Sequence, residues 1–332
     1  MIRPLSEKIK THLCQQALVK LLEHQQNPSL SIYLPAAKTE AQQQAVFERV
    51  LHEAEARLDA FAFEPRIIRI LLDQLLRYSN QPDFWAQSHQ GLALYLSSER
   101  LQAYRCPLQQ YQVRVDDYFY VLPLLNYFLT QQPFYLLWWV DRTPRLFAAG
   151  HQLLELSLPQ ASSPQELPGV LEDHLAPTCF SSQPPLVVVT AERSRFEGLQ
   201  ARLQAAGLPN PCHQLEPECP PEDMYALARS QVDTLLVPEH QQLLNRYLTL
   251  QAQGQTVADL MALTRAAYNS RVSTLFLVTG YEASEDASAL QNQSTDILNR
   301  ATIYTCTNGG RICAARPEQL GGAQRAAAIL RY

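Results

Sequence analysis

The chain has 332 residues, of which 46% are hydrophobic and 18% are charged, and its formal net charge is −5. This balance excludes a disordered chain, and the length suits two or three domains of about a hundred residues each. No apolar run approaches the roughly 20 residues that cross a bilayer and the chain opens without an apolar signal core, so we expect a cytoplasmic protein with no membrane partner.

The first region predicts a mixed α/β domain. An apolar segment at 30–34, followed by a proline, predicts a strand, and residues 92–96 after a glycine predict another. Between them, apolar residues recur at three- and four-residue steps over 46–61 and 68–76, which is typical of two amphipathic helices. A further extended segment is predicted near 111–115.

The second region also alternates strands and helices. Residues 134–149 predict a hairpin with its turn at 141–144, and the apolar run 186–190 predicts a buried strand. Helices are predicted over 196–206 and over 222–238. Because it is rich in Ser, Pro and Gln, the stretch 157–185 predicts an irregular connection.

The third region predicts an α-β-α sandwich. A helix is expected from His240, and a second helix is expected to be capped by Thr256, with Asp259 three residues later as a short variant of a capping box. The inner stripe of that second helix is predicted to comprise Val257, Leu260, Met261, Thr264, Ala267 and Tyr268.

The end of the chain completes this sandwich. Strands are predicted at 273–278, at 311–315 and at the terminus, and a helix is predicted at 297–304. Gly309 and Gly310 follow that helix, and we expect them to form its left-handed C-terminal cap.

These elements together predict an α/β protein with mixed sheets and three domains, at 1–126, 127–239 and 240–332. The first segment carries thirteen basic and thirteen acidic residues, the second six and thirteen, and the third eight and six. Proteins that bind nucleic acid non-specifically show a basic face. The composition therefore argues against a general nucleic-acid binder and against a DNA partner, and it leaves a local RNA contact open.

The residues predict no catalytic site, no cofactor and no metal. No Walker loop and no Gly-x-Ser-x-Gly elbow occurs, and the eight histidines form no recognisable triad order. Cys212 and Cys219 are spaced too widely for a structural zinc site, although His213 could add a ligand. We interpret the seven cysteines as reduced, partly buried thiols.

Scattered acids leave one enzymatic alternative open. Asp141, Glu192 and Asp233 would have to converge to hold the two metal ions of a nuclease. Each follows a predicted strand or lies near a predicted helix end, where carboxylates are usually solvated caps. We therefore favour the interpretation in which they cap elements.

Four arginines are candidates for contact with RNA phosphate. Arg193 and Arg195 follow a predicted buried strand, whereas Arg265 lies in the capped helix of the third region and Arg271 comes just after it. The alternative is that these are solvated arginines on helix faces, which is the commoner situation for this residue type.

Five segments, taken in order, resemble the class-I release factors of archaea and eukaryotes, Pelota and their dispersed bacterial relatives. They are 29–35, 91–95, 115–125, 134–150 and 321–332, the last of which ends Ile-Leu-Arg-Tyr. The resemblance spans nearly the whole chain, and its strength lies in the collinear order. It implies a bacterial member of this family with a release-factor N-type domain, an RNase H-like middle domain and a C domain akin to ribosomal proteins that bind kinked RNA.

The family's catalytic Gly-Gly-Gln loop is expected after Leu158, but residues 159–166 contain no such tripeptide. The similar Gly150-His151-Gln152 directly follows the hairpin, where a glutamine could not extend on a mobile loop. The codon-reading Asn-Ile-Lys-Ser is also absent. The chain is therefore expected not to be an enzyme, because it lacks the loop that hydrolyses peptidyl-tRNA.

We predict a non-catalytic, translation-associated factor that binds the ribosome or rRNA in hibernation, rescue or regulation. An acidic second region also fits an alternative, a protein-interaction adaptor that uses the same fold away from the ribosome. An enzyme with an unrecognised site is the third hypothesis.

Overall fold

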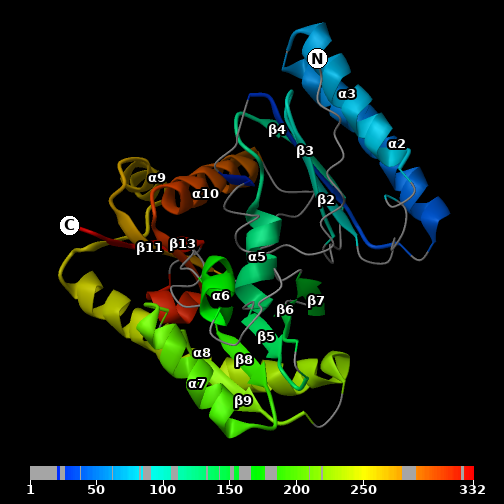
Figure 1. The fold of residues 1–332 in the computed structure, drawn as a ribbon. Coiled ribbons are helices and arrows are strands. Elements are labelled where there is room, and N and C mark those ends of the chain that lie inside the picture. The colour runs from blue at the N-terminus through cyan, green and yellow to red at the C-terminus, as the bar shows by residue number, and fades with distance from the viewer. Residues whose placement is uncertain are drawn as a thin grey trace. The chain divides into compact units, whose positions relative to one another are not determined.

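The computed structural model describes the chain from Leu21 to Tyr332, apart from residues 23–26, 38, 62, 82–83, 85–90, 106–110, 132–133, 142, 150–152, 157–165, 176–184, 209, 218–219, 279–288 and 323–324. The chain divides into two compact units, Met1–Leu125 and Asn126–Tyr332 (Figure 1). Among the described residues, no helix is both long and apolar enough to cross a membrane.

The first unit contains an antiparallel sheet of strand order β3-β2-β1-β4. Its strands are β1 (Ser29–Leu34), β2 (Leu92–Leu96), β3 (Leu101–Arg105) and β4 (Gln112–Asp116), and its helices are α2 (Glu40–Ala60) and α3 (Pro65–Ser79). Successive side chains of a strand point to opposite faces. The residues of even number in β1 and β2 therefore share one face, and both helices cover that face.

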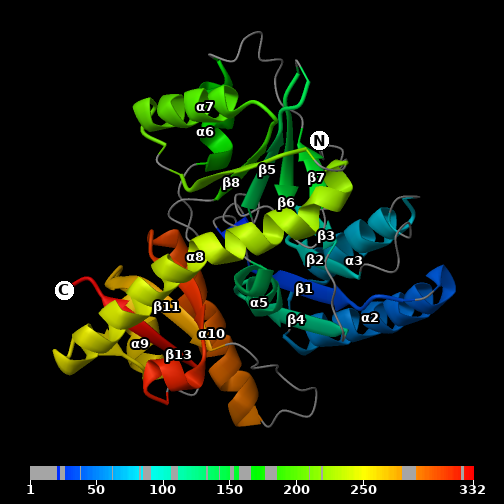
Figure 2. The same ribbon diagram turned by 90° about the horizontal axis from the view of Figure 1, so that it is seen from below.

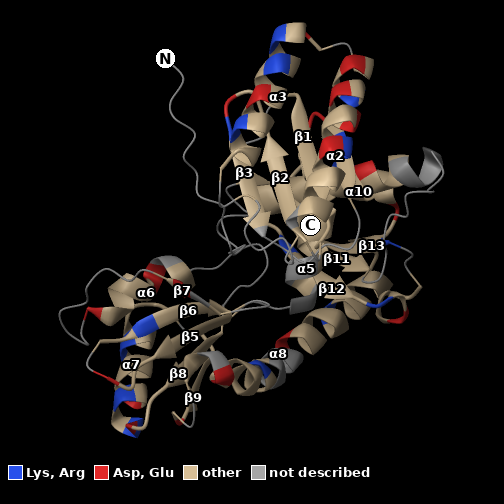
Figure 3. Cartoon of the chain, turned by 90° about the vertical axis from the view of Figure 1, so that its right-hand side faces the viewer, with Lys and Arg blue, Asp and Glu red and all other residues tan. Residues whose placement is uncertain are grey.

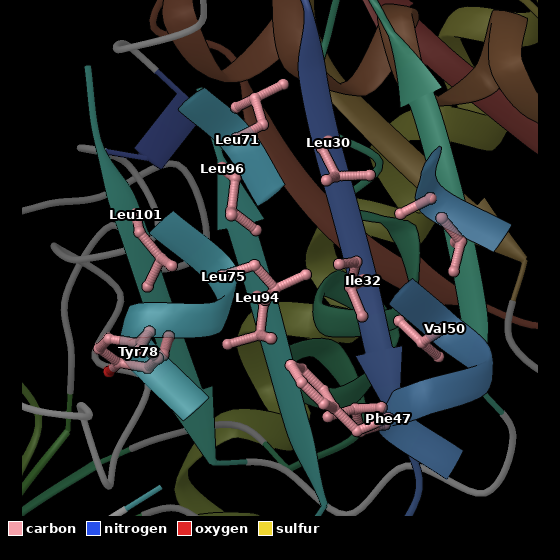
Figure 4. Close-up of a cluster of buried hydrophobic side chains, with 14 of the residues drawn as sticks. Leu30, Ile32, Phe47, Val50, Leu71, Leu75, Tyr78, Leu94, Leu96 and Leu101 are labelled. Carbon is pink, nitrogen blue, oxygen red and sulfur yellow. The ribbon is translucent and has the colours of Figure 1, made fainter. Parts of the chain in front are cut away.

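Apolar side chains of the sheet and of both helices form one core (Figure 4). Leu30 and Ile32 of β1 are fully buried there with Leu94 of β2, Val50 of α2 and Leu75 of α3. Burial of each side chain of this size contributes about 1.5–3 kcal/mol. The helices are held by this shared apolar face, as their sequence periodicity predicts.

Gln43 of α2 is an unusual residue in this unit. Its side chain is 1% exposed, and neither its Nε2 nor its Oε1 has a hydrogen-bond partner in the described part of the chain. Leaving a buried polar group unsatisfied costs about 1–3 kcal/mol. We expect Gln43→Met, which keeps the length of the side chain, to raise the free energy of unfolding in urea by about 1–2 kcal/mol.

Gln44, the next residue along α2, is exposed and provides the matched control. Gln44→Met should change stability by less than about 0.5 kcal/mol. A loss of stability in Gln43→Met would mean that the buried amide has hydrogen-bond partners and stabilises the fold.

The opposite face of this sheet is held together by hydroxyl groups. The Tyr33 and Tyr95 hydroxyls lie 2.8 Å apart, and the Tyr33 hydroxyl also donates to the carbonyl of Tyr120. The backbone N–H of Tyr120 donates to Oγ of Ser31 at 2.9 Å. These bonds fix the segment that follows β4 onto the sheet.

The second unit contains two sheets. The first has strand order β7-β6-β5-β8-β9, in which β5, β8 and β9 are parallel and β6 is antiparallel to both of its neighbours. Its strands are β5 (Phe134–Trp138), β6 (Arg145–Ala149), β7 (Leu153–Leu156), β8 (Leu186–Val189) and β9 (Cys212–Leu215). Buried residues of α6 (Leu167–Leu175) and α7 (Arg193–Ala205) pack on one face, and buried residues of α8 (Pro221–Ala252) pack on the other.

The second sheet of this unit has strand order β10-β13-β11-β12. Its strands are β10 (Thr256–Val257), β11 (Val272–Val278), β12 (Arg311–Ala315) and β13 (Ala326–Leu330). Leu244 and Tyr247 of α8 pack against one face. The helices α9 (Leu260–Tyr268) and α10 (Ala289–Thr307) pack against each other, and both contact β11.

The predicted fold class is confirmed, because one antiparallel sheet and two sheets of mixed strand direction alternate with helices along the chain. The three predicted domain limits stay predictions. Two further elements, the helix α5 (Leu122–Gln131) and the 3₁₀ turn Pro317–Leu320, complete the described chain.

Several predicted boundaries in the second unit are wrong. The helix predicted to end at Pro238 and the helix predicted from His240 are one helix, α8, which Figure 2 shows running on without a break. A proline removes one hydrogen bond from a helix, but packing at both ends of α8 outweighs that loss. The stretch 157–185, predicted to be irregular, contains α6, whose three leucines are buried.

The predicted start of α9 is also wrong. Thr256 lies in β10, where it pairs with Ile329, and the cap is Asp259, whose Oδ1 accepts the N–H of Ala262 at 2.8 Å. The buried face of α9 comprises Leu263, Ala266 and Ala267. Met261 and Tyr268, which the sequence places in the inner stripe, are instead 59% and 67% exposed.

Candidate nucleic-acid interface

Arg193 and Arg195, two of the predicted phosphate contacts, lie on α7 and are paired with acids there. Nε of Arg193 lies 2.8 Å from Oε1 of Glu197, and Nη2 of Arg195 lies 2.7 Å from Oε1 of Glu192. Figure 3 shows the basic and acidic residues interspersed along this helix. Because both of these arginines have an acidic neighbour, they offer little net attraction for a phosphate.

Arg265 and Arg271 lie on α9 and just after it. Arg265 is exposed on the last turn of α9. Ser270 takes a left-handed conformation, with φ of 58°, and turns the chain so that the N–H of Arg271 bonds the carbonyl of Ala266 at 2.8 Å. This turn places Arg271 beside the C-terminal end of α9, immediately before β11.

Antiparallel pairing of β13 with β11 brings the end of the chain to the same place. The N–H of Arg331 donates to the carbonyl of Arg271 at 2.7 Å. Nη2 of Arg271 donates to the main-chain oxygen of Tyr332 at 2.9 Å, and its guanidinium lies over the Tyr332 ring, 5.4 Å from the centroid. Arg271, Arg331 and Tyr332 are therefore held as one group.

Asn308, just beyond α10, connects this group to α9. Its Nδ2 donates to the carbonyl of Ala267 at 2.9 Å, and its own carbonyl accepts Nη2 of Arg331 at 2.8 Å. The ring of Tyr268 packs edge-on against Tyr304 of α10, with 5.3 Å between centroids. The ends of two helices and two strands thus meet here. We call the exposed residues Arg265, Tyr268, Arg271, Arg331 and Tyr332 the Arg–Tyr surface.

The arginines of the Arg–Tyr surface are not neutralised by acidic side chains. Within the described ranges, Arg265, Arg271 and Arg331 form no ion pair with a carboxylate side chain. The side chains of Arg271 and Arg331 each donate to one main-chain oxygen. A guanidinium has five N–H donors. Both therefore keep donors for an anion while the bonds to the protein fix their positions.

The two tyrosines are held on one side and open to solvent on the other. Tyr268 is 67% exposed although Tyr304 contacts its ring, and Tyr332 is 71% exposed although Arg271 covers one of its faces. Restrained aromatic rings next to arginines that carry no carboxylate side-chain partner are the usual components of a surface that binds single-stranded nucleic acid.

Groups that could carry out catalysis are harder to find among the described residues than groups that could bind RNA. No group of three His, Cys, Asp or Glu side chains in the described ranges could hold a metal ion. Burial raises the pKa of the Cys212 and Cys313 thiols to about 11, so both stay protonated at neutral pH. Residues 159–165, where the family's glutamine loop is expected, and residues 150–152, which include the similar Gly-His-Gln, lie outside the described residues, as does the side chain of Asp233.

Sequence reasoning identified two members of the Arg–Tyr surface, Arg265 and Arg271, and missed three. The sequence pattern places Tyr268 in the inner stripe, whereas α9 buries Leu263, Ala266 and Ala267 instead. In the sequence, Arg331 and Tyr332 stand out only as part of the terminal Ile-Leu-Arg-Tyr. No local signal could join them to Arg271, because the contact depends on how β13 pairs with β11.

Neither a protein-family model nor a curated protein matches the sequence. Among solved structures, an archaeal translation termination factor, aRF1, is 13% identical, with 96% of each chain covered and a TM-score of 0.27. Dom34 of S. cerevisiae, a translation termination-like factor, is 12% identical over 73% of this chain and 79% of that one, with a TM-score of 0.40. Archaeal Pelota, from a ribosome-bound model with ABCE1, is 10% identical over 74% and 78%, with a TM-score of 0.41.

Proposed function

We propose that the protein is a cytoplasmic, translation-associated factor of the release-factor and Pelota type, which binds ribosomal RNA through the Arg–Tyr surface without hydrolysing peptidyl-tRNA. The Arg–Tyr surface carries this proposal. It gathers three arginines that form no ion pair with a carboxylate side chain among the described residues and two exposed tyrosines, in a chain whose net charge is −5. The five collinear segments that resemble release factors are the reason for placing the protein in translation and for choosing the ribosome as its partner.

The lack of hydrolysis is supported by the sequence. No Gly-Gly-Gln occurs anywhere in the 332 residues. Residues 127–239, the region that resembles the catalytic domain of release factors, carry six basic against thirteen acidic residues. An acidic region is repelled by rRNA phosphate, and Arg193 and Arg195 do not offset this because they are paired with Glu197 and Glu192. Binding without catalysis suits hibernation, rescue or regulation.

The test is sedimentation of the tagged full chain with lysate of its own host cell through a sucrose gradient, at low and moderate salt. We expect the protein to run with ribosomes and to be released by salt, because phosphate contacts weaken as salt rises. Purified ribosomes loaded with peptidyl-tRNA should release no peptide when the protein is added.

Two matched double variants locate the contact. Arg271→Gln/Arg331→Gln removes two charges from the Arg–Tyr surface, and we expect it to lower the salt dependence of log affinity by about 1.4–1.8. Arg193→Gln/Arg195→Gln removes the same charge from α7 and should bind as the wild type does. Protein that stays at the top of the gradient at both salt concentrations, including with lysate from starved cells, would contradict the proposal and favour the adaptor alternative.

A further inference from the structure

The tyrosines of the Arg–Tyr surface are not needed to attract phosphate. Arginines alone would do so, and rings exposed to water gain nothing from the hydrophobic effect. Tyr268 and Tyr332 nevertheless expose 67% and 71% of their surface. Hydrogen bonds through Asn308 and Arg331 connect the segments that carry them. Two restrained rings in one network with cations indicate a partner that has both flat faces and negative charge.

The exposed face of α9 extends this pattern along the helix. Met261, Arg265 and Tyr268 are four and three residues apart, so they lie on one face, and all three are exposed. At a rise of 1.5 Å per residue, this row is about 10 Å long. The only carboxylate in or capping α9, Asp259, is at the opposite end from Tyr268 and binds the backbone N–H of Ala262. The end of α9 that carries the tyrosine is therefore free of acidic groups of its own.

We propose that the Arg–Tyr surface binds unpaired RNA, with bases stacked on Tyr268 and Tyr332 and the phosphates between them on Arg265, Arg271 and Arg331. This rests on the proposed function for the choice of RNA as the partner. In a duplex the base faces are covered by neighbouring bases, so a ring on the protein can stack only on a base that is unstacked. A duplex would contact the arginines alone and would bind more weakly.

The test is fluorescence anisotropy of the full chain with a labelled ten-nucleotide oligouridylate and with an RNA duplex of equal charge. We expect the single strand to bind at least about tenfold more tightly. Tyr268→Leu and Tyr332→Leu should each weaken binding of the single strand about five- to a hundredfold, which is the effect of losing one stacked base. The salt dependence of this binding should not change, because the arginines remain.

Three controls separate stacking from structure. Tyr268→Phe and Tyr332→Phe keep the rings and should bind within about twofold of the wild type. Phe61→Leu removes a 60% exposed ring from the first compact unit and should have no effect. Equal affinity for duplex and single strand, or leucine variants that bind as the wild type does, would overturn the inference.

The outcomes distinguish this inference from the proposed function. Preference for the single strand, lost with the tyrosines, in a protein that never co-sediments with ribosomes would support the inference and contradict the proposed function. Salt-sensitive ribosome binding that does not change when both tyrosines are replaced would support the proposed function and contradict the inference.

Discussion

Phe276→Ala is expected to lower the free energy of unfolding of the C-terminal sheet by about 3–5 kcal/mol. Phe276 lies in β11, between β13 and β12, and is fully buried. Its ring packs edge-on against Tyr247 of α8, with 5.5 Å between centroids. The truncation would leave a cavity between the sheet and α8. The backbones of the sheet and of α8 cannot move together far enough to fill it.

Because a chain with several sheets need not unfold in one step, hydrogen exchange of the β11 amides is a better measurement than a single urea midpoint. Phe276→Leu, which nearly conserves volume, should cost less than about 1.5 kcal/mol. If the alanine variant protects the β11 amides as well as the wild type does, the ring does not hold the sheet to α8. β11 also positions Arg271, so we expect the alanine variant to lose RNA affinity as well.

Gly310→Ala is expected to destabilise the same region by about 2–3 kcal/mol through overpacking. A Cβ on Gly310 would lie 2.6 Å from Cγ2 of Thr305, 2.9 Å from the Thr305 carbonyl oxygen and 3.0 Å from that of Val272. Two of these three atoms belong to the backbone, so they cannot move aside by a change of rotamer. Relief would require shifting the end of α10 away from β11.

Gly309→Ala is the matched control for that prediction. Gly309 has φ of 69°, but a Cβ there would come no closer than 4.0 Å to a neighbouring atom, Nη2 of Arg331. Only the cost of the left-handed backbone applies, about 1 kcal/mol. Urea unfolding of both variants decides the matter, and a larger loss in Gly309→Ala than in Gly310→Ala would show that no close approach exists at Gly310.

Gly309 and Gly310 illustrate which structural features a local sequence pattern can predict. A glycine pair after a helix predicts a left-handed cap, and Gly309 confirms this prediction. The pattern assigned the same role to Gly310, which does not have a positive φ and instead lies where α10 approaches β11. Backbone conformation is encoded locally, whereas a close approach depends on packing between elements far apart in the chain.

In the candidate site, too, some features are encoded locally and others depend on packing between distant elements. The sequence places Arg265 and Arg271 around the capped helix of the third region. It cannot show that Arg193 and Arg195 are paired on α7, because helical neighbours at that spacing form ion pairs only in some rotamers.

The sequence by itself determined the α/β class, the strands at 30–34 and 92–96, and the hairpin over 134–149, because apolar runs and turn residues act over a few neighbours. Only the tertiary structure decided the Arg–Tyr surface. Pairing of β13 with β11 places Arg331 against Arg271, sixty residues earlier, and the rotation of α9 about its axis turns Tyr268 outward. Strand order and helix rotation minimise the exposed apolar surface of the whole sheet, so no single segment encodes them.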